Sequence, residues 1–230
     1  MKVKNLLKRL FFALAAIAAL CAVTMNNFTA RSAFKGERGF TVAIDAGHGG
    51  IDGGAKGSFY GSVERDINLR IAKELKRRFL SAGFSVVMTR SGEGGLYGAM
   101  SKGFKRRDMD ARVKKIKSSS ADVLVSVHLN KYSDENRRGA QVFFRNGSEP
   151  SRSLAVLVQS RFNDAINVSR KYAPLAGDYY ILNETVIPAV ICECGFLSNE
   201  EDERLLNTKE HVAIVAESIF LGVTDFFASA

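Results

Sequence analysis

Two of the three histidines in the chain lie at the ends of apolar segments rich in β-branched residues. Residues 40–45 form one such segment, and His48 follows it within a stretch that holds six glycines between residues 44 and 57. Residues 121–130 form a second segment, which contains His128 and ends at Asn130. Because α/β proteins place their chemistry at the carboxyl ends of their strands, we expect the two imidazoles to converge on one site.

Two glutamates offer carboxylates to the same site. Glu193 lies in the apolar segment 188–196, where an ionised carboxylate is costly to bury unless something compensates for it. Glu64 lies at the start of a predicted helix. Two imidazoles and one carboxylate form a zinc site with a fourth position left open, and a further carboxylate could act there as a base toward water. The pattern favours a catalytic zinc site over two alternatives, which are structural histidines and a buried Glu193 paired with an arginine such as Arg90.

Alternating strands and helices must position these residues. Apolar residues at every third or fourth position predict helices over residues 63–80, 106–117 and 151–166, and from about Asn207 onward, where Glu210 completes a capping-box pattern. Short apolar runs predict strands over residues 40–45, 84–90, 121–130, 139–145, 178–182 and 188–196. We therefore expect an α/β fold with a single domain, built on a mostly parallel twisted sheet of about six strands with helices on both faces.

The composition fits one globular domain behind an N-terminal export segment. The chain has 230 residues, of which 46% are hydrophobic and 25% charged, and this suffices for one sizeable core. Four basic residues between positions 2 and 9 precede the apolar run 10–25. This order predicts a signal peptide or signal anchor over residues 1–30 and a catalytic domain over residues 31–230. The run is shorter than the roughly 20 residues that span a bilayer, so both a cleaved and a membrane-anchored form stay open.

The charge and the cysteines exclude some functions and leave one rival. The net charge of +9 is spread over the leader and over helical faces such as residues 73–78, which indicates solvated faces or attraction to an anionic polymer or membrane and no nucleic-acid partner. Cys192 and Cys194 are two apart on a predicted strand, a poor geometry for a mutual disulfide, and are expected to be small buried hydrophobes. The rival is a thiol hydrolase that pairs one of them with a histidine.

Four segments in order resemble the zinc-dependent N-acetylmuramoyl-L-alanine amidases of bacterial cell walls, the amidase 3 family. They are DAGHGGIDGGAKG, VERDINLRIAKEL, SVHLN and PAVICECGFLSNEEDE, and the resemblance extends from about residue 41 to residue 227. It implies Zn²⁺ held by His48, Glu64 and His128, with Glu193 as the catalytic glutamate. It also implies peptidoglycan as the substrate and hydrolysis of the amide between muramic acid and L-alanine.

Within this family the motifs are most similar to amidases of spore-cortex peptidoglycan, whose action in germination precedes muramic-δ-lactam formation. The sequence departs from the usual family pattern at Lys117, where asparagine is common, and at Arg137 and Arg138, where aromatic residues often precede the GAQ motif. These departures bear on the substrate subtype. The alternatives are a vegetative-wall autolysin, a metallopeptidase of the stem peptide, and a partner-activated or non-catalytic peptidoglycan-binding homologue.

Further residues near the motifs are assigned supporting roles. Asp45 and Asp52 lie close to His48 in the sequence and could fix an imidazole tautomer, as carboxylates behind metal-bound histidines do. Asn130 and Arg90 are candidates for lining the substrate groove. We expect an exported protein, anchored in the membrane by its N-terminal segment or secreted to the cell wall or the forespore intermembrane space, and an activating partner protein is a further expectation.

Overall fold

The computed structural model describes residues 39–167 and 169–229, and the predicted export segment lies outside them. Their six-stranded sheet has the order β2-β1-β3-β6-β4-β5. The strands are β1 (Thr41–Ala46), β2 (Ser85–Met88), β3 (Val123–Asn130), β4 (Gln141–Arg145), β5 (Leu175–Gly177) and β6 (Ala189–Phe196). β2, β1, β3 and β6 are parallel, whereas β4 runs antiparallel to β6 and parallel to β5. The predicted mostly parallel sheet is confirmed.

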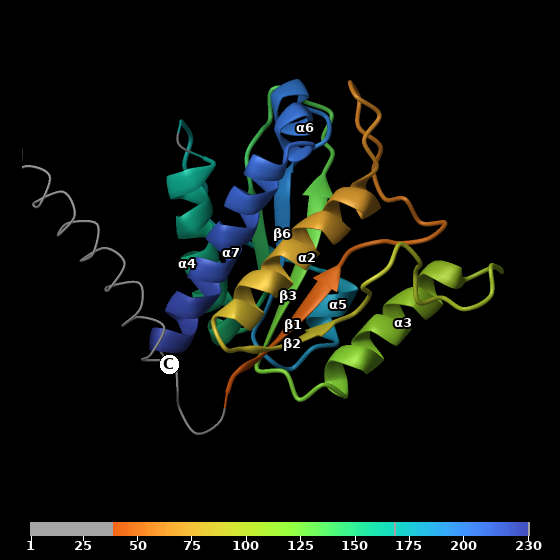
Figure 1. Cartoon of the computed structure of the whole chain (residues 1–230), viewed down its shortest axis with the longest axis vertical. Helices are drawn as coiled ribbons and strands as arrows, with labels where there is room; N and C mark the ends of the chain where they lie inside the picture. The colour runs from red at the N-terminus through yellow and green to blue at the C-terminus, as the bar shows by residue number, and fades with distance from the viewer. Residues whose placement is uncertain (1–38, 168, 230) are drawn as a thin grey trace, which may run out of the picture. The chain divides into compact units, whose positions relative to one another are not determined.

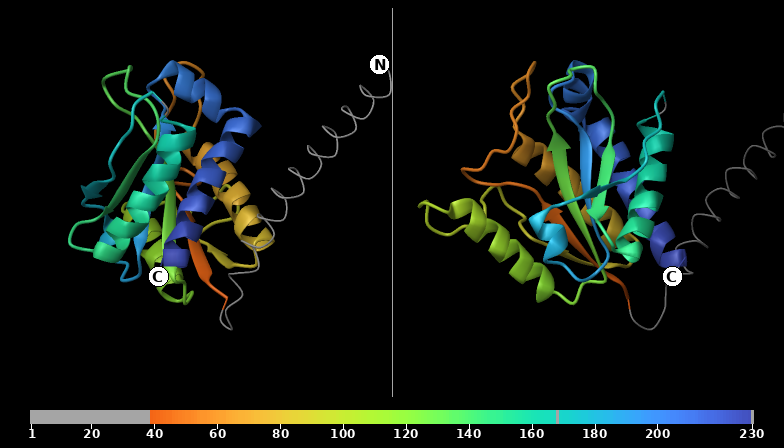
Figure 2. Two further views of the ribbon diagram at one scale, coloured as in Figure 1. Left: turned by 90° about the vertical axis from the view of Figure 1, so that its left-hand side faces the viewer. Right: turned by 180° about the vertical axis from the view of Figure 1, so that it is seen from behind.

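Helices cover both faces of this sheet, as predicted. They are α2 (Glu64–Ser81), α3 (Phe104–Lys117), α4 (Glu149–Ala165), α5 (Tyr180–Asn183), α6 (Glu200–Leu206) and α7 (Lys209–Ser229). Figure 1 shows α2, α7 and α4 side by side over one face, and the reverse view in Figure 2 shows α3 and α5 on the other. α3 and α5 cover the amino-terminal parts of the strands, where Leu124 and Ala189 pack with Ile116 and Ile181.

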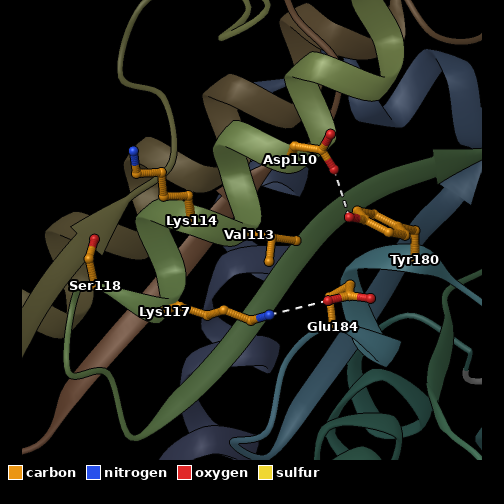
Figure 3. Close-up of a pocket in the computed structure, with 7 residues that line it drawn as sticks. All are labelled: Asp110, Val113, Lys114, Lys117, Ser118, Tyr180 and Glu184. Carbon is orange, nitrogen blue, oxygen red and sulfur yellow. Dashed lines mark hydrogen bonds and ion pairs between the residues drawn. The ribbon is translucent and has the colours of Figure 1, made fainter.

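A pocket of about 490 Å³ lies between α3 and α5. Two contacts cross it (Figure 3): the Tyr180 hydroxyl donates to Asp110 Oδ1 over 2.6 Å, and Lys117 Nζ donates to Glu184 Oε2 over 3.2 Å. Lys117 is one of the departures from the family pattern. Its ammonium group has a structural partner in Glu184, the residue that follows α5.

The C-terminal helix α7 belongs to the core. By length and composition it could cross a membrane, but it packs against α2 and α4, and its apolar positions Val215, Ile219 and Val223 are fully buried. At Gly222 a Cβ atom would lie 2.5 Å from Val158 Cα on α4. Only a residue without a side chain permits this approach of the two helices, because tightly packed interiors have no room for an added methyl group.

Two local predictions were wrong. Residues 178–182 form no strand: the chain turns into the short helix α5, which buries Ile181 and Leu182 together against the core, and the fifth strand lies just before it. A run of only five residues is compatible with both the two-residue period of a strand and the 3.6-residue period of a helix, and tertiary packing decided between the two structures. The last helix begins near Asn207 as predicted, at Lys209, but its expected cap was wrong: Thr208 Oγ1 accepts the cap hydrogen bond from His211 N, and Asn207 is instead the C-cap of the separate helix α6.

We predict that Gly222→Ala destabilises the protein by about 1–3 kcal/mol, although alanine favours an isolated helix by about 1 kcal/mol. The added methyl group must push α7 away from α4. Urea unfolding measures the difference. Gly92→Ala is the matched control, because nothing lies within 4 Å of its Cβ position. Equal stability of the two variants would contradict the tight contact.

Candidate metal centre and active site

The ends of three parallel strands bring the predicted site residues together. Ala46 of β1 is in register with Val127, and His128 of β3 is in register with Glu193 of β6. Residues in register share a face of the sheet, so His128 and Glu193 project to the same side. Glu64, the first residue of α2, completes the site: within the described part of the chain, ligand atoms of His48, Glu64 and His128 all lie within 4.8 Å of one another.

Glu64 holds the two imidazoles. Its Oε1 lies 3.2 Å from His48 Nε2 and 3.1 Å from His128 Nδ1. The carboxylate also accepts hydrogen bonds from the backbone N–H groups of Ala55 (2.7 Å) and Leu129 (3.1 Å). Burial opposes ionisation of Glu64, but the hydrogen bonds from His128 and His48 outweigh it and hold its pKa well below the usual range. A buried anion therefore stands at the point where the imidazoles meet.

This donor set fits a zinc ion. Two imidazole nitrogens and one carboxylate oxygen are ligands that zinc accepts, and three protein ligands leave a position open. The outward nitrogen of His48, Nδ1, lies 2.8 Å from Asp52 Oδ2. A carboxylate on that nitrogen fixes the tautomer that keeps Nε2 free for a metal. The contact predicted between Asp52 and His48 is confirmed, and Asp52 is itself paired with Lys105 at 3.3 Å.

Glycines allow the loop after β1 to deliver His48. His48 itself has a positive φ of 62°. A side chain at Gly47 would overlap the imidazole ring of His128, and one at Gly54, where φ is 69°, would overlap the carboxylate of Glu64. The backbone of this loop thus packs directly against two of the metal-site side chains, which only glycine permits at these positions.

Glu193 differs from Glu64 in having no partner for one of its oxygens. Its side chain is 9% exposed, and no hydrogen bond reaches Oε2 from the described residues. Burial raises the pKa of Glu193 to about 7, against the opposing influence of His128. The alternative of a structural glutamate paired with Arg90 is not what the structure shows, because the Arg90 guanidinium bonds elsewhere. A buried carboxyl beside a metal site with a pKa near neutrality is suited to moving protons.

The role expected for Asp45 is corrected by the structure. Asp45 points beneath the site and does not bond to His48. It is 1% exposed and accepts hydrogen bonds from Thr89 (2.7 Å), Ser126 (2.6 Å) and Arg112 Nη1 (2.7 Å). Burial opposes its ionisation, but Arg112 lowers the pKa of Asp45 to about 2. Asp45 belongs to β1, before the loop that carries His48. Its carboxylate therefore binds side chains of neighbouring elements beneath the site and not the imidazole of His48.

Arg90 also has a structural position and does not line a groove. It is 3% exposed, and its guanidinium donates to the carbonyl oxygens of Ala46 (2.8 Å), Gly47 (3.0 Å) and Arg65 (2.8 Å). Its donors are used to hold the loop that carries His48. Asn130 is half-buried at the end of β3, and its Oδ1 accepts from Lys131 N at 2.8 Å, so its role toward substrate stays a prediction.

The cysteines do not fit the rival of a thiol hydrolase. Cys192 and Cys194 are fully buried and free, and burial raises the pKa of both thiols far above neutrality. Reactive cysteines need a stabilised thiolate and access to substrate. Both residues behave as the small buried hydrophobes that the sequence predicts.

Sequence reasoning missed Arg112 and Glu203. Arg112 is 1% exposed and also binds Asp108 at 2.6 Å and the carbonyl oxygen of Ala46 at 2.7 Å. Glu203 is fully buried on α6 and accepts hydrogen bonds from the backbone N–H groups of Phe59 (2.8 Å), Tyr60 (3.0 Å) and Ser62 (3.0 Å). Each lies among charged neighbours in the sequence, which is the pattern of a solvated helical face, so no local signal distinguishes them.

A mostly parallel α/β sheet that carries a His-Glu-His cluster able to hold a metal ion, beside a buried carboxyl, is an arrangement suited to metal-assisted hydrolysis. The family described as N-acetylmuramoyl-L-alanine amidase (Amidase_3) matches residues 42–225. The chain belongs to this family, as the motifs of the sequence predict.

Individual relatives agree with that assignment. The germination-specific N-acetylmuramoyl-L-alanine amidase of Bacillus subtilis (strain 168) is 33% identical over 193 residues, which are 82% of this chain and 80% of the relative. The structure of the CwlD amidase from Clostridioides difficile in complex with the GerS lipoprotein is similar with a TM-score of 0.80 and 31% identity, covering 83% of this chain and all (100%) of that one. The catalytic domain of CwlV from Bacillus (Paenibacillus) polymyxa var. colistinus follows with a TM-score of 0.71 and 27% identity, over 83% and 99% of the two chains.

We predict that Asp52→Asn weakens zinc binding about 10- to 100-fold, because the imidazole of His48 loses the carboxylate that orients it. Competition with a chromogenic chelator measures the zinc dissociation constant. Asp66→Asn, a change at a half-exposed carboxylate in the first turn of α2, close to Glu64 in the sequence, is the control and should bind zinc like the unaltered chain. Unchanged affinity in Asp52→Asn would contradict the orienting role.

Asp45→Asn is expected to cost about 3 kcal/mol of stability at neutral pH, because Arg112 would then be buried without one of its two carboxylates. The pKa of Asp45 is lowered from 3.8 to about 2, so its contribution is present above pH 4 and is lost as the pH falls toward 2. The difference between the two proteins should therefore shrink over that interval. Urea unfolding from pH 7 to pH 2.5 tests this, with Asp164→Asn at an exposed ion pair as the control.

Proposed function

We propose that this chain hydrolyses the amide bond between N-acetylmuramic acid and L-alanine in peptidoglycan, and that its substrate is the spore cortex. The observation that carries the proposal is the position of the buried carboxyl of Glu193, in register with His128 beside the His48–Glu64–His128 cluster. Membership of the amidase family supplies the reaction, and the site supplies residues suited to each part of it.

Zinc would be held by His48 Nε2, Glu64 Oε1 and His128 Nδ1, the atoms that converge in the structure. When bound, the ion supplies a Lewis acid that polarises the amide carbonyl and stabilises the negative charge developing on its oxygen. Asp52 holds the tautomer of His48, and the Arg112–Asp45 pair supports the strand end from which the loop departs. These residues keep the ligands in place throughout the reaction.

Glu193 moves the proton. As a carboxylate it takes a proton from the attacking water while the water oxygen bonds to the carbonyl carbon, and it then gives this proton to the alanine nitrogen as the C–N bond breaks. The products are the lactyl carboxylate of muramic acid and a stem peptide with a free N-terminal alanine. A pKa raised to about 7 suits a group that must both accept and return a proton near neutral pH.

The cortex substrate and the cellular setting rest on the relatives. The B. subtilis relative is named as germination-specific, and the C. difficile relative was solved with a lipoprotein partner. We infer that this chain is exported through residues 1–30, works at the cortex, and binds a partner protein that assists it. The half-buried Asn130, two residues after His128 on β3, is proposed to contact the substrate.

We predict that the full-length chain, supplied with zinc, releases stem peptides with a new N-terminal alanine from purified cortex peptidoglycan, and that chelation abolishes the release. Glu193→Gln should lower the rate at least about 100-fold while zinc remains bound, because the ligands are unchanged and only the proton carrier is lost. Mass spectrometry of the digest and metal analysis of the protein measure both. Glu149→Gln, an exposed glutamate on α4, is the matched control.

The digests distinguish the alternatives. Cleavage within the stem peptide would identify a metallopeptidase, and equal release from vegetative wall would contradict the preference for cortex. Full activity of Glu193→Gln would contradict its role as the proton carrier. Activity only after addition of a lipoprotein partner would place the chain among partner-activated amidases.

A further inference from the structure

A second pocket, of about 450 Å³, lies where the segment after β3 meets the segment before β5. In the strand order it is toward β4 and β5, whereas the metal ligands are toward β1 and β3, with β6 between them. Its wall includes aromatic and basic side chains and the first residue of β4. These are Tyr132, Arg137, Gln141, Arg170, Lys171 and Tyr172. Asp134 is the one carboxylate among the residues lining this pocket, so the described lining carries a surplus of positive charge.

Two guanidinium groups of this pocket are held by aromatic rings and not by acids. Arg137 Cζ lies 5.1 Å from the ring centre of Tyr132 and 5.4 Å from that of Phe196, and Arg170 Cζ lies 5.4 Å from the ring centre of Tyr172. No ion pair joins either guanidinium to another described residue. Stacking orients a guanidinium while leaving its N–H groups free to bind an anion.

The neighbouring basic residues, unlike Arg137 and Arg170, form ion pairs with acids. Arg138 is paired with Asp202 at 3.7 Å, and Lys171 with Asp164 at 3.3 Å. Asp134 Oδ1 already accepts hydrogen bonds from its neighbour Asn136, over 3.0 Å from the backbone N–H and 3.1 Å from the side chain. In the pocket between α3 and α5, Lys117 likewise has an acid partner, Glu184 (Figure 3). Arg137 and Arg170 are therefore the cations of this pocket that lack an anion.

The pocket adjoins the reaction centre through the register of the sheet. Gln141, at the start of β4, is the antiparallel partner of Glu193. The register of β3 and β6 shifts by one residue, so that His128 pairs with Glu193 but Asn130 pairs with Phe196. This shift, at Gly195 with φ 153°, turns Phe196 to the face that carries His128 and Glu193. Arg137, stacked on Phe196, is consequently on the side of the sheet where the amide is cleaved.

We propose that Arg137 and Arg170 form a subsite for a carboxylate of the stem peptide, two or three residues beyond the scissile amide. The inference rests on the proposed function, since it assumes that the stem peptide leaves from Glu193 across β4. Neighbouring strands are about 4.8 Å apart and an extended chain advances about 3.3 Å per residue, so two or three extended residues are long enough to pass from β6 across β4. The second and third residues of stem peptides carry carboxylates, which match guanidinium groups in charge and shape.

Binding of a product peptide tests this subsite without requiring catalysis. The probes are L-alanyl-γ-D-glutamyl-meso-diaminopimelate with its carboxylates free and the same tripeptide with them amidated. We expect the full-length chain to bind the free form at least about tenfold more tightly, an advantage that weakens as salt is raised. Arg137→Gln and Arg170→Gln should each remove most of this preference, and on peptidoglycan they should raise KM with little change in kcat.

Controls separate the subsite from folding and from the proposed function. Arg152→Gln, at an exposed ion pair on α4, should keep the preference. Thermal unfolding checks each variant, and the exposed Arg170 provides a second test if Arg137→Gln fails to fold. Equal binding of both peptides by the unaltered chain, or an undiminished preference in Arg170→Gln, would overturn the subsite. Selective peptide binding without any hydrolysis of peptidoglycan would instead support the subsite and contradict the amidase activity.

Discussion

The buried carboxylate of Glu64 is the interaction on which the site depends. It joins α2 to two other parts of the chain, because it contacts His48 and Ala55 from the glycine-rich loop after β1, and His128 and Leu129 from β3. An anion at 3% exposure is tolerated only where donors surround it. The groups that satisfy it are the imidazoles that would bind a metal, so the requirement to compensate one charge and the requirement to assemble a metal site have the same solution.

A second group of buried charged side chains lies beneath the Glu64 site, and each of them is likewise compensated by hydrogen-bond partners. Arg112 and Asp45 are almost fully buried, and each is bonded on several sides. Arg90 adds a cation whose partners are the carbonyl oxygens of the loop that delivers His48. Breaking any of these contacts would leave a buried charge without compensation, which costs more than the contact itself contributes. The glycine-rich loop is therefore held rigidly, although glycines alone would leave it free.

Glu193 and the pair Arg137 and Arg170 are the exceptions to this pattern of compensation. Glu193 keeps one oxygen without a described partner in a buried setting, and the two guanidinium groups stack on rings and form no ion pair with a described residue. Asn68, whose side-chain amide donates to Glu64 Oε1, likewise keeps its Oδ1 without a partner among the described residues. Groups that a fold leaves unsatisfied beside a reaction centre are the ones available to bind or transform a substrate.

The sequence by itself determined the alternation of strands and helices and the residues His48, Glu64, His128 and Glu193, and it offered Asp45 and Asp52 equally as partners of His48. Short-range signals carry this information: the period of apolar residues, glycines around a histidine, and a carboxylate within an apolar run. Tertiary structure decided that Asp45 turns to Arg112, that Arg90 binds carbonyl oxygens, and that residues 180–183 form a helix. It also decided where Arg137 stacks. Such partners lie tens of residues apart, and a charged side chain in a helix looks the same in sequence whether water or a buried acid receives it.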